Sequence, residues 1–182
     1  IVFTLFLQLK SITKLPIIAK GILDEEDAIC AARCGASGIV VSNHGGRQID
    51  GAVPAIEALP HIISALKKES LNVDVYVDSG TMCIPNLFPR LLLQHHSHPP
   101  PLTTLGVRSG VDIVKALSLG AKAVLIGRPV LWGLAIGGHE GLERMLNCLK
   151  DEFTNDLMSL GCPKASDLGH HVFWNYKQKA LL

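Results

Sequence analysis

The chain has no block of like charge and no basic stripe. Its 182 residues include 17 lysines and arginines and 16 aspartates and glutamates, so the formal net charge is +1 at neutral pH. This balance argues against nucleic-acid binding and against a charged disordered tail. Hydrophobic residues make up 48% of the sequence, enough to bury the core of one ordinary globular domain. We therefore expect a globular protein with no nucleic-acid partner.

Paired cysteines and long apolar runs are also missing. The five cysteines follow no disulfide framework, which is usual in a reducing compartment. The apolar stretch at residues 1–9 is too short to span a bilayer. It also lacks the basic flank and cleavage site of a signal peptide, and no initiator methionine precedes it. We expect no membrane partner and a chain that starts within a longer product.

The sequence instead alternates short apolar runs with helical patterns. The runs predict strands at 16–19, 38–41, 73–77 and 123–126. Capping residues and apolar spacing predict helices at 24–33, 55–68, 111–119 and 141–160. Strands alternating with helices imply a parallel sheet, and short continuous apolar strands imply burial on both faces.

The most informative polar loop follows the second strand. The run from Val40 to Gly51 reads VVSNHGGRQIDG, with two glycines between His44 and Arg47. Glycines allow a tight turn that leaves room for a ligand. An imidazole base beside a carboxylate-binding guanidinium suits proton removal from a carbon next to a carboxylate. The alternative is a polar loop that caps the strand and carries a surface histidine and a surface arginine.

The other strand ends also carry polar groups. Lys20 would stabilise negative charge on a cofactor, or extend to solvent at the rim. Asp78 would accept hydrogen bonds from ligand hydroxyls, or cap the next helix. Arg108 and the pair Gly127 and Arg128 follow the last two predicted strands. Barrel enzymes place a phosphate site after strands seven and eight, where a helix N-terminus and guanidinium groups would bind it.

One segment, 81–105, breaks the alternation. It has five prolines, no acidic residue and no clear period, in a place where a loop should be short. We predict a disordered insertion. It contains four residues of metal-ligating types, namely Cys83, His95, His96 and His98. Because no rigid element would fix their spacing, we predict no metal site there.

Four of these motifs together resemble the FMN-dependent α-hydroxy acid oxidases, the family of glycolate oxidase and the animal 2-hydroxyacid oxidases. The matching runs are Pro16–Ile22, Val40–Asp50, Val107–Leu117 and Gly127–Leu134. They occur in the family's order, which makes the resemblance specific. It implies a (β/α)₈ TIM barrel of the α/β class, of which this chain holds about the last four βα units. Residues 1–182 would then be the C-terminal half of one FMN hydroxy acid dehydrogenase domain.

The resemblance also implies roles for individual residues. His44 would be the catalytic base, and Arg47 would bind the substrate carboxylate. The implied FMN contacts are Lys20 and Ser42 at the flavin, Asp78 at the ribityl chain with Gly80 beside it, and Arg108, Gly127 and Arg128 at the phosphate. The reaction would oxidise a 2-hydroxy acid to a 2-oxo acid, with O₂ reduced to H₂O₂.

Departures from the family pattern set limits on these expectations. The first half of the barrel supplies further flavin and substrate contacts, so this chain alone should have little or no oxidase activity. The competing hypothesis is an inactive fragment that acts only by associating with other chains, because half a barrel has two unpaired strand edges. The resemblance also suggests a homo-oligomer and a peroxisomal location, although the sequence closes with Lys-Ala-Leu-Leu rather than Ser-Lys-Leu.

Overall fold

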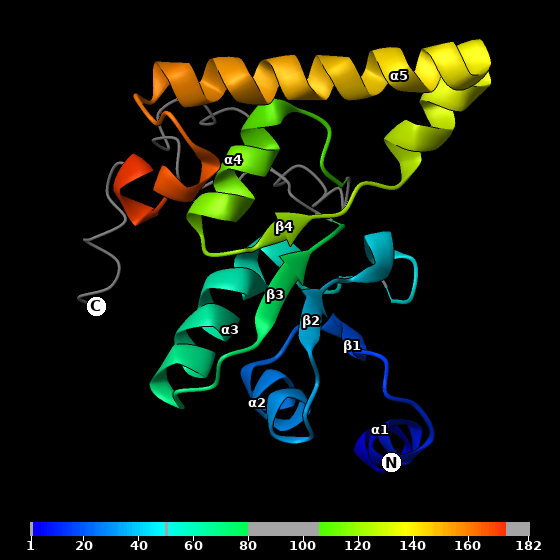
Figure 1. Ribbon diagram of the computed structural model, residues 1–182, viewed down its shortest axis with the longest axis vertical. Helices are drawn as coiled ribbons and strands as arrows, with labels where there is room; N and C mark the ends of the chain where they lie inside the picture. The colour runs from blue at the N-terminus through cyan, green and yellow to red at the C-terminus, as the bar shows by residue number, and fades with distance from the viewer. Residues whose placement is uncertain (1, 50, 80–105, 174–182) are drawn as a thin grey trace, which may run out of the picture.

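A four-stranded parallel sheet forms the centre of the computed structural model, which describes residues 2–49, 51–79 and 106–173. The strands are β1 (Ile18–Ile22), β2 (Gly38–Val41), β3 (Asp74–Val77) and β4 (Ala123–Val124). They lie side by side in chain order, and each pair is parallel (Figure 1). This order is that of four consecutive strands of a (β/α) barrel, and it confirms the predicted parallel sheet.

Each strand is followed by a helix, as predicted. The helices are α1 (Val2–Ile12), α2 (Glu25–Arg33), α3 (Ala55–Lys68), α4 (Gly110–Ser118) and α5 (Arg128–Ser159), with short 3₁₀ turns at His44–Gly46, Ala165–Asp167 and His170–Val172. Asp24 caps α2 by accepting a hydrogen bond from the Glu26 amide at 2.8 Å. None of the described helices is long and apolar enough to cross a membrane.

Two helices differ from the sequence-based expectation. Helix α1 was not predicted at all. The helix expected at 141–160 is the second part of α5, which already begins at Arg128 and breaks at Gly137 and Gly138. Gly138 has a φ of 56°, so the two parts of α5 meet at a sharp bend, visible at the right of Figure 1. The predicted insertion at 81–105 lies outside the described residues.

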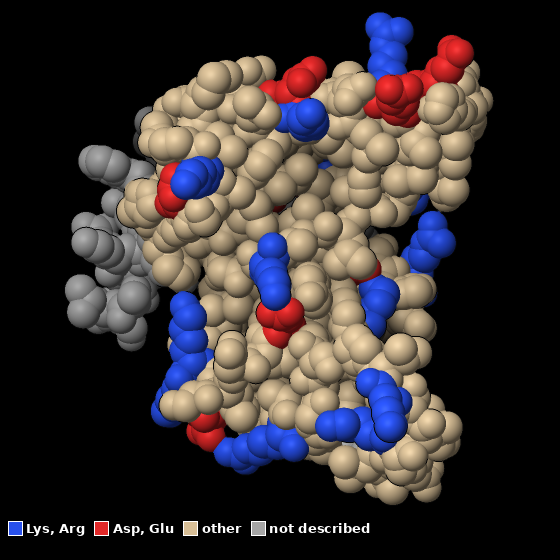
Figure 2. Space-filling view, in the orientation of Figure 1, with Lys and Arg blue, Asp and Glu red and all other residues tan. Residues whose placement is uncertain are grey.

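The hydrophobic core lies between the sheet and helices α2 and α3. Ile39 and Val41 of β2 belong to one hydrophobic cluster with Leu59 and Ile62 of α3, and all four are fully buried. Burying a side chain of this size contributes roughly 1.5–3 kcal/mol. On the face shown in Figure 2, charged side chains are scattered over an otherwise uncharged surface, consistent with the near-zero net charge.

Burial on both faces was predicted for every strand, and this was wrong for all but β2; in β3 only alternate residues are buried. All four residues of β2 are buried, whereas β1 and β4 have no buried residue. The reason is that β1 and β4 form the two edges of the described sheet, so each lacks a neighbour on one side. The first strand also lies at Ile18–Ile22 rather than 16–19, so Lys20 is inside the strand instead of following it.

Helices α4 and α5 pack closely at Gly110. The Gly110 amide donates a hydrogen bond to Glu152 Oε2 at 2.8 Å. A Cβ atom at this position would collide with the backbone of Glu152 and Phe153.

Replacing Gly110 with alanine should therefore force α5 away from α4. We expect Gly110→Ala to lower the free energy of unfolding by roughly 1–3 kcal/mol, the usual cost of overpacking. Denaturant unfolding would measure it. Gly137→Ala is the control, because a Cβ there meets no atom within 4 Å. Equal stability of the Gly110→Ala variant and the parent chain would contradict this packing argument.

Candidate active site

A cavity of about 540 Å³ opens at the carboxyl ends of the strands, within the size range of small-molecule sites. Its charged and hydroxyl-bearing lining residues are Lys20, His44, Arg47, Asp78, Ser79, Arg108 and Arg128. They come from β1, the loop after β2, the end of β3, the segment before α4 and the first turn of α5. Six side chains selected from the sequence at four different strand ends thus converge on one cavity, whereas Ser42, also selected, is not among its lining residues.

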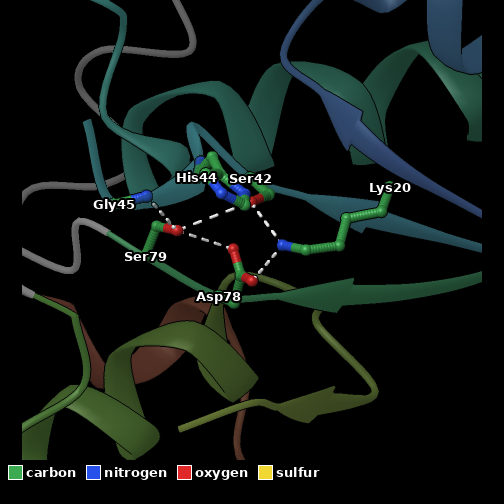
Figure 3. A network of polar contacts seen from close by, with 6 residues as sticks. All are labelled: Lys20, Ser42, His44, Gly45, Asp78 and Ser79. Carbon is green, nitrogen blue, oxygen red and sulfur yellow. Dashed lines mark hydrogen bonds and ion pairs between the residues drawn. The ribbon is translucent and has the colours of Figure 1, made fainter. Parts of the chain in front are cut away.

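A polar network joins the first three strands at this end (Figure 3). Lys20 Nζ donates a hydrogen bond to Ser42 Oγ at 2.8 Å and forms an ion pair with Asp78 Oδ2. The Ser42 side chain is buried between them, at 2% exposure. Lys20 therefore has partners across the sheet, and Asp78 does not cap α4, whose N-cap residue is Ser109.

The environment of Asp78 favours its charged form. Partial burial by itself would raise the pKa of this carboxyl, but hydrogen bonds from Lys20, Ser42 and Ser79, together with the Lys20 charge, outweigh it. The pKa of Asp78 therefore lies below its ordinary value. The carboxylate stays ionised at neutral pH and can only accept hydrogen bonds.

The loop that carries His44 and Arg47 has an unusual backbone. His44, Gly45 and Gly46 have φ values of 56°, 70° and 71°, three left-handed residues in succession. Two hydrogen bonds hold this turn. The His44 amide donates to Ser42 Oγ at 3.1 Å, and the Gly45 amide donates to Ser79 Oγ at 2.8 Å. The backbone is thus fixed while the exposed His44 and Arg47 side chains line the cavity.

The part of the cavity lined by the start of α5 suits an anion. Helix α5 begins at Arg128 with no side-chain cap and no acidic residue in its first turn, and open space surrounds Gly127. The helix N-terminus carries a partial positive charge and exposed amides, which bind phosphate groups. Arg108 and Arg128 add guanidinium groups to the cavity lining, and that of Arg128 lies close to Gly45. This donor set fits a phosphate, and Asp78 fits the hydroxyl groups of an attached sugar alcohol chain.

Ser79 and Trp132 are two of the cavity residues that were not predicted from the sequence. Ser79 was overlooked because it follows the more obvious Asp78, although a hydroxyl directly after a strand end is itself a signal. Trp132, 49% exposed, lines the cavity one helical turn after Arg128. That spacing along α5 was the available signal.

The remaining predicted residues are not among those that the structure describes. Gly80 and the metal-ligating types in the insertion, Cys83, His95, His96 and His98, lie outside the described residues. Within the part of the chain that is described, no group of three or more histidine, cysteine or acidic side chains is arranged to hold a metal ion.

The chain is similar to known proteins over most of its length. Residues 4–83 and 102–175 match the model of the family described as FMN-dependent dehydrogenase. The chain is 39% identical over 163 residues to human 2-hydroxyacid oxidase 2, covering 90% of this chain and 38% of that protein. It is 40% identical over 160 residues to L-lactate oxidase of Nostoc, covering 88% and 36%.

A plant relative and solved structures give the same result. A peroxisomal (S)-2-hydroxyacid oxidase of Arabidopsis thaliana is 40% identical, with 96% of this chain and 40% of that protein covered. Mandelate oxidase with (S)-4-hydroxymandelic acid superposes with a TM-score of 0.71 at 39% identity, covering 90% of this chain and 38% of that one. A variant of it carrying a monooxide FMN adduct gives the same TM-score and identity, covering 90% and 43%. The chain spans less than half the length of each of these proteins.

The lowered pKa of Asp78 makes a prediction about stability and pH. Because the folded pKa lies below the unfolded one, ionised Asp78 stabilises the fold above about pH 4. This contribution is lost as the pH falls through the folded pKa. Asp78→Asn should therefore lower the free energy of unfolding by roughly 1 kcal/mol at pH 7, and the difference from the parent should shrink below about pH 4.

Thermal unfolding of both proteins between pH 7 and pH 3 would measure this difference. Asp151→Asn, an exposed acid on α5, is the control and should change little. A stability difference for Asp78→Asn that stays constant over this range would contradict the assignment.

Proposed function

Because the chain belongs to the family of FMN-dependent dehydrogenases, we propose that it is the part of a flavin-dependent barrel enzyme that oxidises a 2-hydroxy acid to a 2-oxo acid. Molecular oxygen would be the electron acceptor and hydrogen peroxide the second product. The observation that carries the proposal is the convergence of the His44–Arg47 loop, the Lys20–Asp78 pair and the α5 N-terminus on one cavity.

The residues present fit FMN along the length of the cavity. The α5 N-terminus with Arg108 and Arg128 would bind the phosphate. Asp78 would accept hydrogen bonds from the ribityl hydroxyls, and Lys20 would lie at the flavin ring, where its charge favours added electron density. When bound, FMN would supply the two-electron acceptor that side chains lack. Gly80, also expected at the cofactor, lies outside the described residues.

The chain's own residues would position the substrate and move a proton. Arg47 would hold the carboxylate of the 2-hydroxy acid through two parallel hydrogen bonds. His44 would remove a proton from the C2 position or its hydroxyl and become imidazolium. Since the hydrogen bonds to Ser42 and Ser79 fix the loop backbone, the base and the carboxylate anchor would approach the substrate in one fixed arrangement.

The relatives support the class of substrate, but they differ in the size of the molecule on which they act. Those compared above act, by their names, on lactate, on 2-hydroxy acids and on mandelate. These molecules share the hydroxyl and carboxylate that His44 and Arg47 would bind and differ in the rest. A peroxisomal location is proposed on the name of the Arabidopsis relative.

A second candidate function is association with another chain, and the exposed sheet edges favour it. Pairing Ile18 with Gly38 puts Ile18 on the sheet face away from the core, where it is 48% exposed, and Leu125 beyond β4 is 45% exposed. Apolar side chains on an unpaired edge favour contact with further strands. In this reading the fragment contributes structure rather than catalysis.

The proposed roles can be separated in a hybrid enzyme in which this chain replaces the matching segment of human 2-hydroxyacid oxidase 2. His44→Ala should slow flavin reduction about 10²- to 10⁴-fold with FMN still bound, because a general base is lost. Arg47→Lys keeps the charge but loses the two-point contact, so KM should rise. Arg128→Ala should instead weaken FMN binding.

Stopped-flow flavin bleaching and FMN titration would measure these effects. The division of roles would be wrong if Arg47→Lys lost FMN at an unchanged KM, or if Arg128→Ala retained FMN as the parent does.

The isolated 182-residue chain should be nearly inactive, since it spans 38% of that human relative. Purified chain with added FMN and glycolate or lactate should give no more peroxide than its His44→Ala variant. Light scattering of the same samples tests the association reading, in which Ile18→Lys should reduce self-association. Peroxide production that depends on His44 would show instead that this part of the barrel suffices.

A further inference from the structure

Ser79 occupies a backbone conformation that serine rarely adopts. Its φ is 57°, in the left-handed region that favours glycine. In the described part of the chain, the other residues besides glycine with positive φ are His44 and Ser70. His44 and Ser79 both line the cavity, on the loops that follow β2 and β3. Such conformations persist where surrounding contacts hold them, often at functional sites.

The contacts that hold Ser79 use its hydroxyl fully. Asp78 is ionised and can only accept, so the Ser79 hydroxyl donates to Asp78 Oδ1 at 2.8 Å. The same oxygen accepts the Gly45 amide at 2.8 Å. Ser42 Oγ, which accepts from Lys20 and from the His44 amide, lies 3.4 Å from Ser79 Oγ. One hydroxyl thus makes three contacts (Figure 3).

These contacts connect two parts of the proposed site. Gly45 is the neighbour of His44 and lies in the turn that ends at Arg47, whereas Asp78 belongs to the cofactor end. Resting on the function proposed above, we propose that Ser79 is a positioning residue whose hydroxyl ties the His44–Arg47 loop to Asp78. The base and the cofactor-binding carboxylate then keep one relative position. A glycine would adopt this backbone conformation with less strain, but it would leave the Gly45 amide and Asp78 without this partner.

The test compares Ser79→Gly and Ser79→Ala with the same changes at Ser70. Ser70 has a φ of 54° and lies exposed in the turn after α3, so it is matched in residue type and backbone but has no contact with the site. Hydrogen exchange of the Gly45 amide, followed by NMR in the full 182-residue chain without FMN, is the first measurement. We expect exchange about tenfold faster in both Ser79 variants and unchanged exchange in both Ser70 variants.

The second measurement is the pKa of Asp78, obtained by titration with carboxyl NMR. If Ser79 served only to shape its own loop, replacing it would leave this pKa unchanged. Losing the hydroxyl removes a donor to the carboxylate, so the pKa of Asp78 should rise in the Ser79 variants alone. Ser79→Gly relieves the backbone strain and should fold, which keeps the comparison interpretable. Unchanged Gly45 exchange in Ser79→Gly, or equal acceleration in the Ser70 variants, would overturn the proposal.

Neither measurement requires flavin or substrate. If the hybrid enzyme failed to oxidise hydroxy acids while Gly45 exchange responded to Ser79, the proposed function would be wrong and the link through Ser79 would stand. If the hybrid enzyme were active while Gly45 exchange and the Asp78 pKa did not change in the Ser79 variants, the proposed function would stand and the link through Ser79 would be wrong.

Discussion

The ion pair between Lys20 and Asp78 is the interaction on which the site depends. Lys20 belongs to β1 and Asp78 follows β3, so their contact passes over the end of β2, where Ser42 lies buried beneath it. Asp78 is the more buried partner, with 19% of its side chain exposed against 44% for Lys20. A partly buried carboxylate is tolerated because its charge is matched and its oxygens are hydrogen-bonded. The pair therefore holds three strand ends in one arrangement, and hydrogen bonds to Ser42 and Ser79 join the His44–Arg47 loop to the same network.

The order of the strands explains both the shared cavity at their ends and the exposure of the two edge strands. Four parallel strands in chain order bring every loop that follows a strand to the same edge, so one cavity collects residues from four loops. The same order leaves β1 and β4 at the edges of the described sheet, with none of their residues buried. The relatives, whose chains are more than twice as long as the matched part, have the additional length to supply further strands. The shared cavity at the strand ends and the exposed strands at the sheet edges are thus two results of one topology.

The sequence was sufficient where a local pattern decides the structure. Asp24, the apolar spacing of 55–68 and the strand at 38–41 were predicted and observed, because capping and burial act within a few residues. The convergence of His44, Asp78 and Arg128 was also predictable, since parallel strands end at a common edge. The exposure of β1 was not predictable in this way, because it arises from the position of β1 at the edge of the described sheet. Nor was the role of Ser79, because its positive φ arises from contacts with Gly45 and Asp78 that form only in the folded chain.

The charge of the cavity lining gives a physical reason for the proposed positions of the cofactor phosphate and the substrate. Lys20, Arg47, Arg108 and Arg128 line it, and Asp78 is the acidic residue among the lining residues. The Lys20–Asp78 pair is internally balanced, so the cavity lining has a net positive charge from its three arginines, and the α5 N-terminus adds to it. A phosphate carries up to two negative charges and a 2-hydroxy acid carries one, which matches this surplus. Arg128 begins α5 and Arg108 precedes α4, whereas Arg47 belongs to the same loop as His44. A phosphate bound at the α5 N-terminus, as proposed above, would leave Arg47, beside His44, to the singly charged substrate.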